Sequence, residues 1–267
     1  MRQRARPGAK ARVLSALAAL TLVAALAAGG IARGERAQRG DLIVSLDGQL
    51  APLKLPRGRP APVSVSLEGG LQTAGGGELP RVTEVQLGLP SRGVLSTRGL
   101  PSCSRHRLQH TTTAEAREAC GGALVGSGQM QADVLLPNQE PFRIHADLLA
   151  FNGTVDGKRA VLMHAFAAKP PTVVVLPFVF HRGAGRFGTA LVADLPPSLG
   201  PWPHFAHFQM TLGRRYEYRG RSRSYLSASC PIPPRITAGF FSLAKVTFTL
   251  EDGGEISTGI ARSCRAS

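Results

Sequence analysis

Residues 142–163 read FRIHADLLAFNGTVDGKRAVLM, and this stretch contains two strand patterns joined by turn residues. Apolar side chains fall on every second residue between positions 142 and 148, which is the period of a strand with one wet face. Asn152-Gly153 and Asp156-Gly157 follow, and both pairs favour the positive φ that tight hairpins need. Strands joined so closely run antiparallel. The stretch therefore predicts an antiparallel hairpin.

The same alternation recurs along most of the chain. Further alternating segments cover residues 63–67, 83–87, 130–136, 206–212 and 244–250. Residues 173–180 differ because they are apolar on both faces, and Pro177 among them requires a bulge or an edge position. The pattern predicts an all-β fold, an antiparallel β-sandwich of two sheets, with barrel-like closure as the alternative.

One short helical segment interrupts the strands. Thr112 and Glu115 have the spacing of a capping box before a helix over residues 114–119. The chain has four cysteines, Cys103, Cys120, Cys230 and Cys264. An even number in an exported chain indicates disulfides, and three pairings are possible. We expect bridges between the first two and between the last two, because each pair brackets a compact local unit. The first bridge then clamps the helical segment onto the sheet.

The first 32 residues have the composition of a leader. Five basic residues precede an alanine-rich apolar run, and small residues follow it. This order is typical of a Sec-type signal peptide. The alternative is an uncleaved membrane anchor, because the run nearly reaches the roughly 20 residues of a span. We therefore expect a secreted or cell-surface protein, with a flexible N-terminus over 33–40 and one β-sandwich domain over 41–267. Residues 69–77, which are glycine-rich, predict a flexible loop.

Several segments together resemble a family of uncharacterised exported bacterial proteins. They are LPSC (100–103), HTTTAEAREACGGALVGSG (110–128), LLAFNG (148–153), SYLSASCP (224–231), TFTLEDGG (247–254) and RSC (262–264). In that family four cysteines flank a short helix and a terminal hairpin. The resemblance implies export and paired cysteines, and because no activity is attached to the family it implies no functional residue.

An arginine- and tyrosine-rich stretch is the sharpest candidate site. It contains Arg214, Arg215, Tyr216, Tyr218, Arg219, Arg221 and Arg223 around a turn at Gly220. Guanidinium groups beside aromatic rings bind phosphate, sulfate or carboxylate groups and stack on sugars. The formal net charge of +15 also favours anionic partners. The charge names no partner by itself; an anionic cell-surface polymer or glycan is the partner expected if this stretch binds a ligand, a membrane only if the leader stays uncleaved, and cytoplasmic nucleic acid is not expected. The alternative is a solvated hairpin whose arginine stems cover apolar surface.

The histidines give weaker candidates. His145 and Asp147 share a strand face and resemble a base with its orienting carboxylate, and with His164 they suggest a dispersed hydrolase site. No GxSxG nucleophile elbow accompanies them. His204 and His207 point to opposite faces of a regular strand. His106 and His110 have helical metal-binding spacing, but the following residue is arginine rather than the glutamate of a metalloprotease.

The sequence thus predicts a non-enzymatic exported β protein that acts as an interaction module. No catalytic residue, metal or cofactor is expected. The alternatives are a secreted hydrolase that uses the dispersed histidine and aspartate residues, and a polyanion- or glycan-binding module that uses residues 214–225.

Overall fold

One long, mostly antiparallel sheet dominates the computed structural model, which describes residues 35–197 and 203–267. The first strands are β1 (Glu35–Arg39), β2 (Leu42–Ala51), β3 (Lys54–Leu55), β4 (Ala61–Pro62), β5 (Ser64–Thr73), β6 (Val82–Leu89), β7 (Val94–Leu95), β8 (Leu124–Val134) and β9 (Phe142–Val155). The later strands are β10 (Lys158–Ala168), β11 (Pro171–Arg182), β12 (Thr189–Asp194), β13 (Pro203–Leu212), β14 (Arg215–Tyr218), β15 (Arg221–Ser224), β16 (Leu226–Ala228), β17 (Ala238–Leu250) and β18 (Glu255–Ala266).

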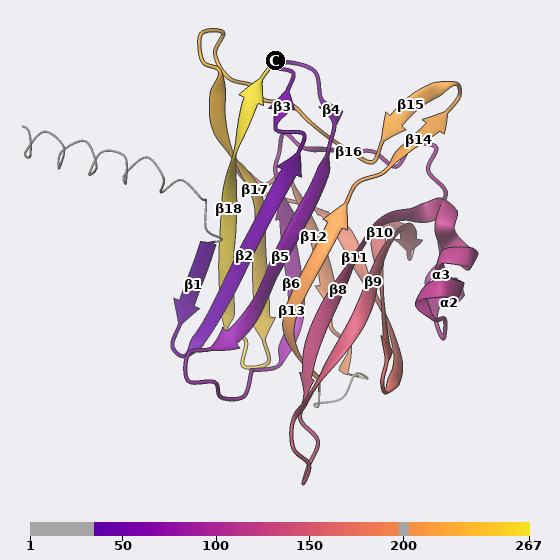
Figure 1. The fold of residues 1–267 in the computed structure, drawn as a ribbon, viewed down its shortest axis with the longest axis vertical. Helices are drawn as coiled ribbons and strands as arrows, with labels where there is room; N and C mark the ends of the chain where they lie inside the picture. Colours follow the sequence, from indigo (N-terminus) through magenta and orange to yellow (C-terminus); the bar gives the residue numbers. More distant parts are fainter. Residues whose placement is uncertain (1–34, 198–202) are drawn as a thin grey trace, which may run out of the picture. The chain divides into compact units, whose positions relative to one another are not determined.

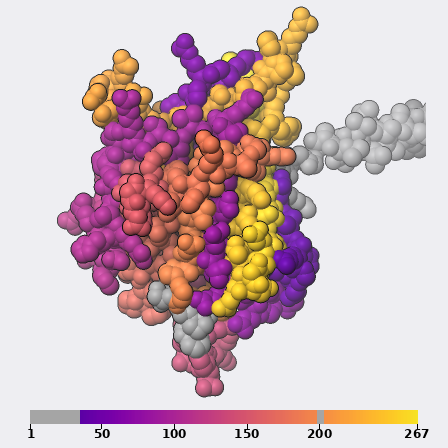
Figure 2. Space-filling view, turned by 180° about the vertical axis from the view of Figure 1, so that it is seen from behind, coloured from indigo at the N-terminus to yellow at the C-terminus, as the bar shows by residue number. Residues whose placement is uncertain are grey.

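Thirteen of these strands pair in the order β1-β2-β5-β13-β8-β9-β10-β11-β12-β6-β17-β18-β3. Every pairing is antiparallel except the short one between β18 and β3. Seen from behind, β11, β12, β6, β17 and β18 follow one another across the surface (Figure 2). The predicted all-β, mostly antiparallel fold is confirmed. These strands form one continuous sheet instead of the two separate sheets of a sandwich. This sheet curls until β18 lies beside β2 (Figure 1), so the architecture is the predicted alternative of barrel-like closure.

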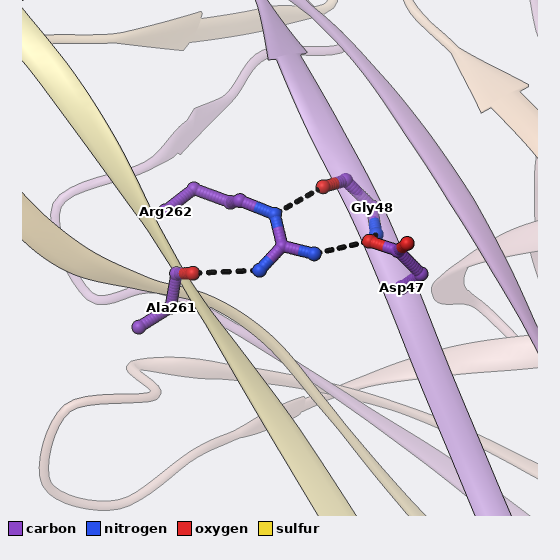
Figure 3. A network of polar contacts seen from close by, with 4 residues as sticks. All are labelled: Asp47, Gly48, Ala261 and Arg262. Atoms are coloured by element: carbon purple, nitrogen blue, oxygen red, sulfur yellow. Dashed lines mark hydrogen bonds and ion pairs between the residues drawn. The ribbon is translucent and has the colours of Figure 1, made fainter. Parts of the chain in front are cut away.

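The seam between β2 and β18 is closed by side chains rather than by a ladder of backbone hydrogen bonds. Arg262 on β18 donates from Nε to the carbonyl oxygen of Gly48 on β2 at 2.6 Å, and its Nη2 pairs with the carboxylate of Asp47 (Figure 3). A Cβ added at Gly48 would lie 2.8 Å from Cδ1 of Ile260, so the missing side chain lets the two strands approach. Arg39 on β1 donates to the carbonyl oxygen of Glu255 on β18 at 2.9 Å, which adds a second contact between this edge of the sheet and β18.

The helical segment covers the outer face of β9, β10 and β11. It consists of α2 (Arg105–Leu108), α3 (Thr113–Cys120) and the short 3-10 helix η1 (Gly121–Ala123). Leu108 and Ala116 are fully buried against outward-facing Phe151 and Leu162 of the sheet. Thr112 and Glu115 form the predicted capping box, and the hydrogen bonds from Thr112 lower the pKa of the Glu115 carboxyl. This packing fixes the segment as a small patch on the outside of the curled sheet.

Both predicted disulfides are present. Cys103 is bonded to Cys120 across the helical segment, and Cys230 is bonded to Cys264 of β18. Bridges of this kind form and persist in oxidising compartments outside the cytoplasm. No described helix is both long enough and apolar enough to cross a bilayer.

Three local predictions were wrong. The described part of the N-terminus predicted to be flexible is strand β1, which pairs along its whole length with β2. The glycine-rich loop predicted over 69–77 starts later, because β5 continues to Thr73. Asn152-Gly153 lies inside β9, and only Asp156-Gly157 forms the turn, with φ of 50° and 74°. The buried Asn152 side chain instead donates to the carbonyl oxygen of Pro101 at 2.8 Å, so tertiary contacts override its turn preference.

Other local predictions are confirmed or untested. Pro177 pairs with β10 on one side, while the ladder with β12 begins only at Val179, so this proline has the expected edge environment. The signal peptide or anchor predicted over 1–32 lies outside the described residues.

Candidate functional site: an apolar cavity inside the curled sheet

The curled sheet encloses a cavity of about 560 Å³. Its wall is built from the inward-facing, alternate residues of nearly every long strand. These include Val65 and Leu67 of β5, Leu87 of β6, Met130 of β8, Ile144 and Leu148 of β9, Val161 and Met163 of β10, Val174 and Phe178 of β11, Phe208 and Met210 of β13, and Phe248 of β17. This volume falls within the roughly 300–1,000 Å³ of small-molecule binding sites.

The interior stays hollow because the curl is wide and many inward side chains are small. Ala167 on β10 lies directly opposite Ala146 on β9, and Ala165 and Ala132 face the cavity from β10 and β8, so four inward positions on this side of the wall carry only a methyl group. Aromatic residues, which fill the most space, are only 6% of the chain. Native interiors contain few voids larger than a water molecule. A large apolar void that is retained in the fold is therefore a space suited to an apolar guest, as in engineered apolar cavities that stay dry and bind benzene.

Some of the inward side chains are partly exposed, whereas others that line the cavity, such as Leu148 and Phe248, are buried. Leu87, Met130 and Phe178 lie in the middle of the sheet and point to its concave side, yet each is only half-buried. Fully packed positions on the outer side of the same sheet, such as Leu162, have no exposed surface. The concave face thus presents apolar surface that a bound ligand would bury.

The cavity reaches the surface at one end of the sheet. Val94 and Phe240 both line it, and they are 44% and 85% exposed. Val94 belongs to β7 and pairs with β16, whereas Phe240 lies near the start of β17. This end of the sheet also carries β4 and the chain's C-terminus (Figure 1). The opening therefore carries an exposed aromatic side chain.

Few polar groups line the cavity. Among its described lining residues the charged ones are Arg92, in the loop between β6 and β7, and Arg186, in the loop between β11 and β12. Tyr225 is buried in the wall, and burial raises the pKa of its phenol while nearby Arg159 lowers it less. The Tyr225 hydroxyl has no hydrogen-bond partner within the described chain. The wall is therefore apolar along its length, with charge confined to the two loops.

The predicted arginine and tyrosine site is divided by the structure. Arg214 donates to the carbonyl oxygens of Gly121 and Leu124 at 2.8 and 2.7 Å, which fixes the end of the helical segment. Tyr216 donates to the carbonyl oxygen of Arg98 at 3.0 Å, and the Tyr218 ring packs on Gly99.

The other arginines of the predicted site are exposed on the β14–β15 hairpin. Arg219 lies at the turn beside the Tyr218 ring, and Arg221 pairs with Tyr218 across the hairpin. Arg215 and Arg223 are also exposed and lie across from Ser224 and Tyr216. Part of the set thus anchors the hairpin, and polyanion binding by the remainder stays a prediction.

The dispersed histidine and aspartate residues do not form a joined site. His164 is fully buried, and its Nε2 donates to the carbonyl oxygen of Thr111 at 2.9 Å. Asp147 accepts from the Thr113 hydroxyl at 3.1 Å, and His145 is exposed. No hydrogen bond in the described structure links these three side chains. Burial lowers the pKa of the His164 imidazole and the Thr111 bond raises it less, so burial disfavours the charged form of this side chain.

The other histidine pairs do not form a metal site. A bulge between Phe205 and His207 shifts the register of β13, so His204 and His207 both face the outer side, contrary to the prediction for a regular strand. Each contacts a different glutamate, Glu78 or Glu68.

His106 lies in α2, but the helix ends at Leu108 and His110 follows in the left-handed region. Within residues 35–197 and 203–267 no group of three or more potential metal ligands occurs.

Sequence reasoning missed the cavity, although it identified most of the strands that line it. The available signal was the pair of small inward residues, Ala165 and Ala167, which follow Val161 and Met163 at alternate positions of one strand. Comparisons of this chain with protein-family models, with curated proteins and with solved structures found no match.

Proposed function

We propose that this protein is an exported, non-enzymatic binding protein that holds an apolar ligand inside its curled sheet. The observation that carries the proposal is the 560 Å³ cavity with its apolar lining, in which several inward-facing side chains are only half-buried. Covering such surface stabilises a complex by about 25 cal/mol for each Å² of apolar area removed from water. Small curled sheets that close around one ligand are an established way to carry apolar molecules.

Export is supported by the two disulfides and by the basic and apolar order of residues 1–32. An apolar molecule is poorly soluble in the aqueous space beyond a cell membrane. A protein that encloses it there keeps it dispersed. The absence of hydrogen bonds between His145, Asp147 and His164 in the described structure supports binding over hydrolysis.

Filling the cavity tests the proposal. Ala165→Phe and Ala146→Phe place a ring in the void from two different strands. We expect each variant to bind the neutral fluorophore N-phenyl-1-naphthylamine about tenfold or more weakly than the wild type. The thermal midpoint should not fall in parallel, because the ring enters empty space. Ala114→Phe, on the exposed side of α3, is the matched control and should bind the fluorophore normally.

The proposal fails if the wild-type protein does not enhance the fluorescence of this neutral probe. It also fails if both filled variants fold and bind the probe as the wild type does. Organic extraction of protein purified from the culture medium or cell envelope supplies a second measurement, because a carrier recovered there should release an apolar molecule detectable by mass spectrometry.

A further inference from the structure

Two arginines supply all of the charge among the described residues that line the cavity. Arg92 and Arg186 lie at its open end, and no aspartate, glutamate or lysine accompanies them in the wall. Opposite charges are otherwise mixed along this chain, which has 32 basic and 17 acidic residues. An opening that carries cations alone favours negative charge and repels positive charge.

The loops that carry these arginines are held against each other. The backbone N–H of Ser91 donates to the carbonyl oxygen of Arg186 at 2.9 Å. A Cβ added at Gly188 would lie 2.9 Å from Cα of Ser91, so the second loop packs tightly on the first. The first loop is a tight turn in which Gly93 N–H donates to the Pro90 carbonyl oxygen at 3.0 Å. The two guanidinium groups are therefore presented from a fixed pair of backbones.

Neither guanidinium is engaged elsewhere in the described structure. Arg81, Arg143 and Arg262 each pair with a carboxylate. Arg92 and Arg186 form no ion pair and no side-chain hydrogen bond within residues 35–197 and 203–267, and both are exposed. Their donors are available to a ligand, while their aliphatic stems extend the apolar wall.

We infer that the ligand is an anionic amphiphile, whose apolar chain lies in the cavity and whose carboxylate or phosphate group is bound by Arg92 and Arg186. This inference rests on the proposed function. The planar guanidinium fork matches the geometry of carboxylate and phosphate oxygens and remains charged at any physiological pH. The chain supplies most of the affinity, and the two arginines select and orient the head group.

Competition against the neutral fluorophore tests the choice of head group. The competitors share one chain and differ in charge: hexadecanoate, hexadecyl phosphate, hexadecanol and hexadecylamine, each below its aggregation threshold. We expect the wild type to prefer the better anion to hexadecanol by about tenfold, as for a charge-assisted hydrogen bond. The amine should compete least. Raising the salt concentration should shrink the preference.

The double variant Arg92→Gln/Arg186→Gln should bind the neutral fluorophore as the wild type does, and its preference for the anion should fall to about twofold or less. Arg36→Gln/Arg105→Gln removes the same charge from exposed positions of β1 and α2 and should retain the preference. A wild type that binds the neutral fluorophore without preferring either anion overturns this inference and leaves the proposed function intact. Loss of the preference in the control variant also overturns it.

Comparison of hexadecanoate with hexadecyl phosphate shows whether the site prefers a carboxylate or a phosphate head group. A third arm offers vesicles of phosphatidylglycerol and measures the lipid that co-elutes with the protein after the vesicles are removed. Transfer from these vesicles by the wild type and not by Arg92→Gln/Arg186→Gln identifies a phospholipid as the source. Transfer that is equal in both proteins contradicts a role for the arginines.

Discussion

Arg262 on β18 reaches across the seam of the curled sheet and donates from Nε to the carbonyl oxygen of Gly48 on β2 at 2.6 Å. Only 12% of its side chain is exposed, and Asp47 neutralises its charge. The two residues are 214 positions apart in sequence, and their contact joins strands that share no backbone ladder. The seam therefore depends on side chains that can be changed one at a time.

Replacing Arg262 should weaken the seam. Arg262→Leu removes the bonds to Gly48 and Asp47, and hydrogen bonds to charged groups contribute about 1.5–3 kcal/mol each. We expect the free energy of unfolding in urea to fall by about 2 kcal/mol. Arg81→Leu, which breaks a more exposed ion pair with Glu251, should lower it by about 1 kcal/mol or less. Equal effects of the two substitutions would contradict a special role for the seam.

Adding one methyl group at Gly48 should also strain the seam. A Cβ there would meet Cδ2 of Leu67 at 2.7 Å and Cδ1 of Ile260 at 2.8 Å. Overpacking of this kind costs about 1–3 kcal/mol, so Gly48→Ala should lower the thermal midpoint by several degrees. Gly58→Ala is the control, because nothing lies within 4 Å of its added Cβ. An unchanged midpoint for Gly48→Ala would show that the strands can separate there at no cost.

Burial of His164 should make stability depend on pH. Because the pKa of His164 is lower in the folded protein than the ordinary 6.5, the unfolded chain binds a proton that the folded chain resists. The contribution of neutral His164 to the free energy of unfolding is therefore fully present above pH 6.5. It is lost as the pH falls from 6.5 through the lower pKa of the folded protein. We expect His164→Gln, measured by urea unfolding at pH 7.5, 6.5 and 5.5, to lose less stability on acidification than the wild type. Parallel curves for the two proteins would show that another group is responsible.

Removing the first disulfide should loosen the helical segment without emptying the cavity. Cys103→Ser/Cys120→Ser opens a 17-residue loop, for which the chain-entropy model predicts a loss of about 3 kcal/mol. Hydrogen exchange should accelerate in α2 and α3 and remain slow in β17 and β18. The neutral fluorophore should still bind, because the segment packs on the outer face of the sheet. Loss of binding in a folded variant would instead place the segment at the ligand.

The exposed hairpin arginines should add charge but no specific polyanion site. Four are replaced by glutamine together: Arg215, Arg219, Arg221 and Arg223. The control variant loses four other exposed arginines: Arg36, Arg59, Arg105 and Arg117. We expect both variants to elute from heparin at the same reduced salt concentration, since each loses the same charge. Earlier elution of the hairpin variant alone would establish the polyanion site that the sequence predicts.

Local sequence patterns sufficed for much of the fold and for little of the candidate site. Alternation revealed the strands, and the spacing of Thr112 and Glu115 revealed the capped helix. Arg214 and Tyr216 were predicted as ligand contacts, but they bind backbone carbonyls of segments about 90 and 118 residues away. Arg92 and Arg186 were not singled out, because nothing in their own neighbourhoods shows that the two loops meet.

The sequence by itself determined much of the strand content and the capped helix, because each depends on residues close together along the chain, and it left three cysteine pairings open, of which the structure has the expected one. Only the tertiary structure decided that one sheet curls on itself, that Arg262 closes the seam, and that the concave side stays hollow. The alternation of apolar and polar residues predicts which side chains share a face of the sheet, but it does not predict how strongly the sheet curves. The curvature determines whether opposing apolar side chains meet in a filled core or line an open cavity.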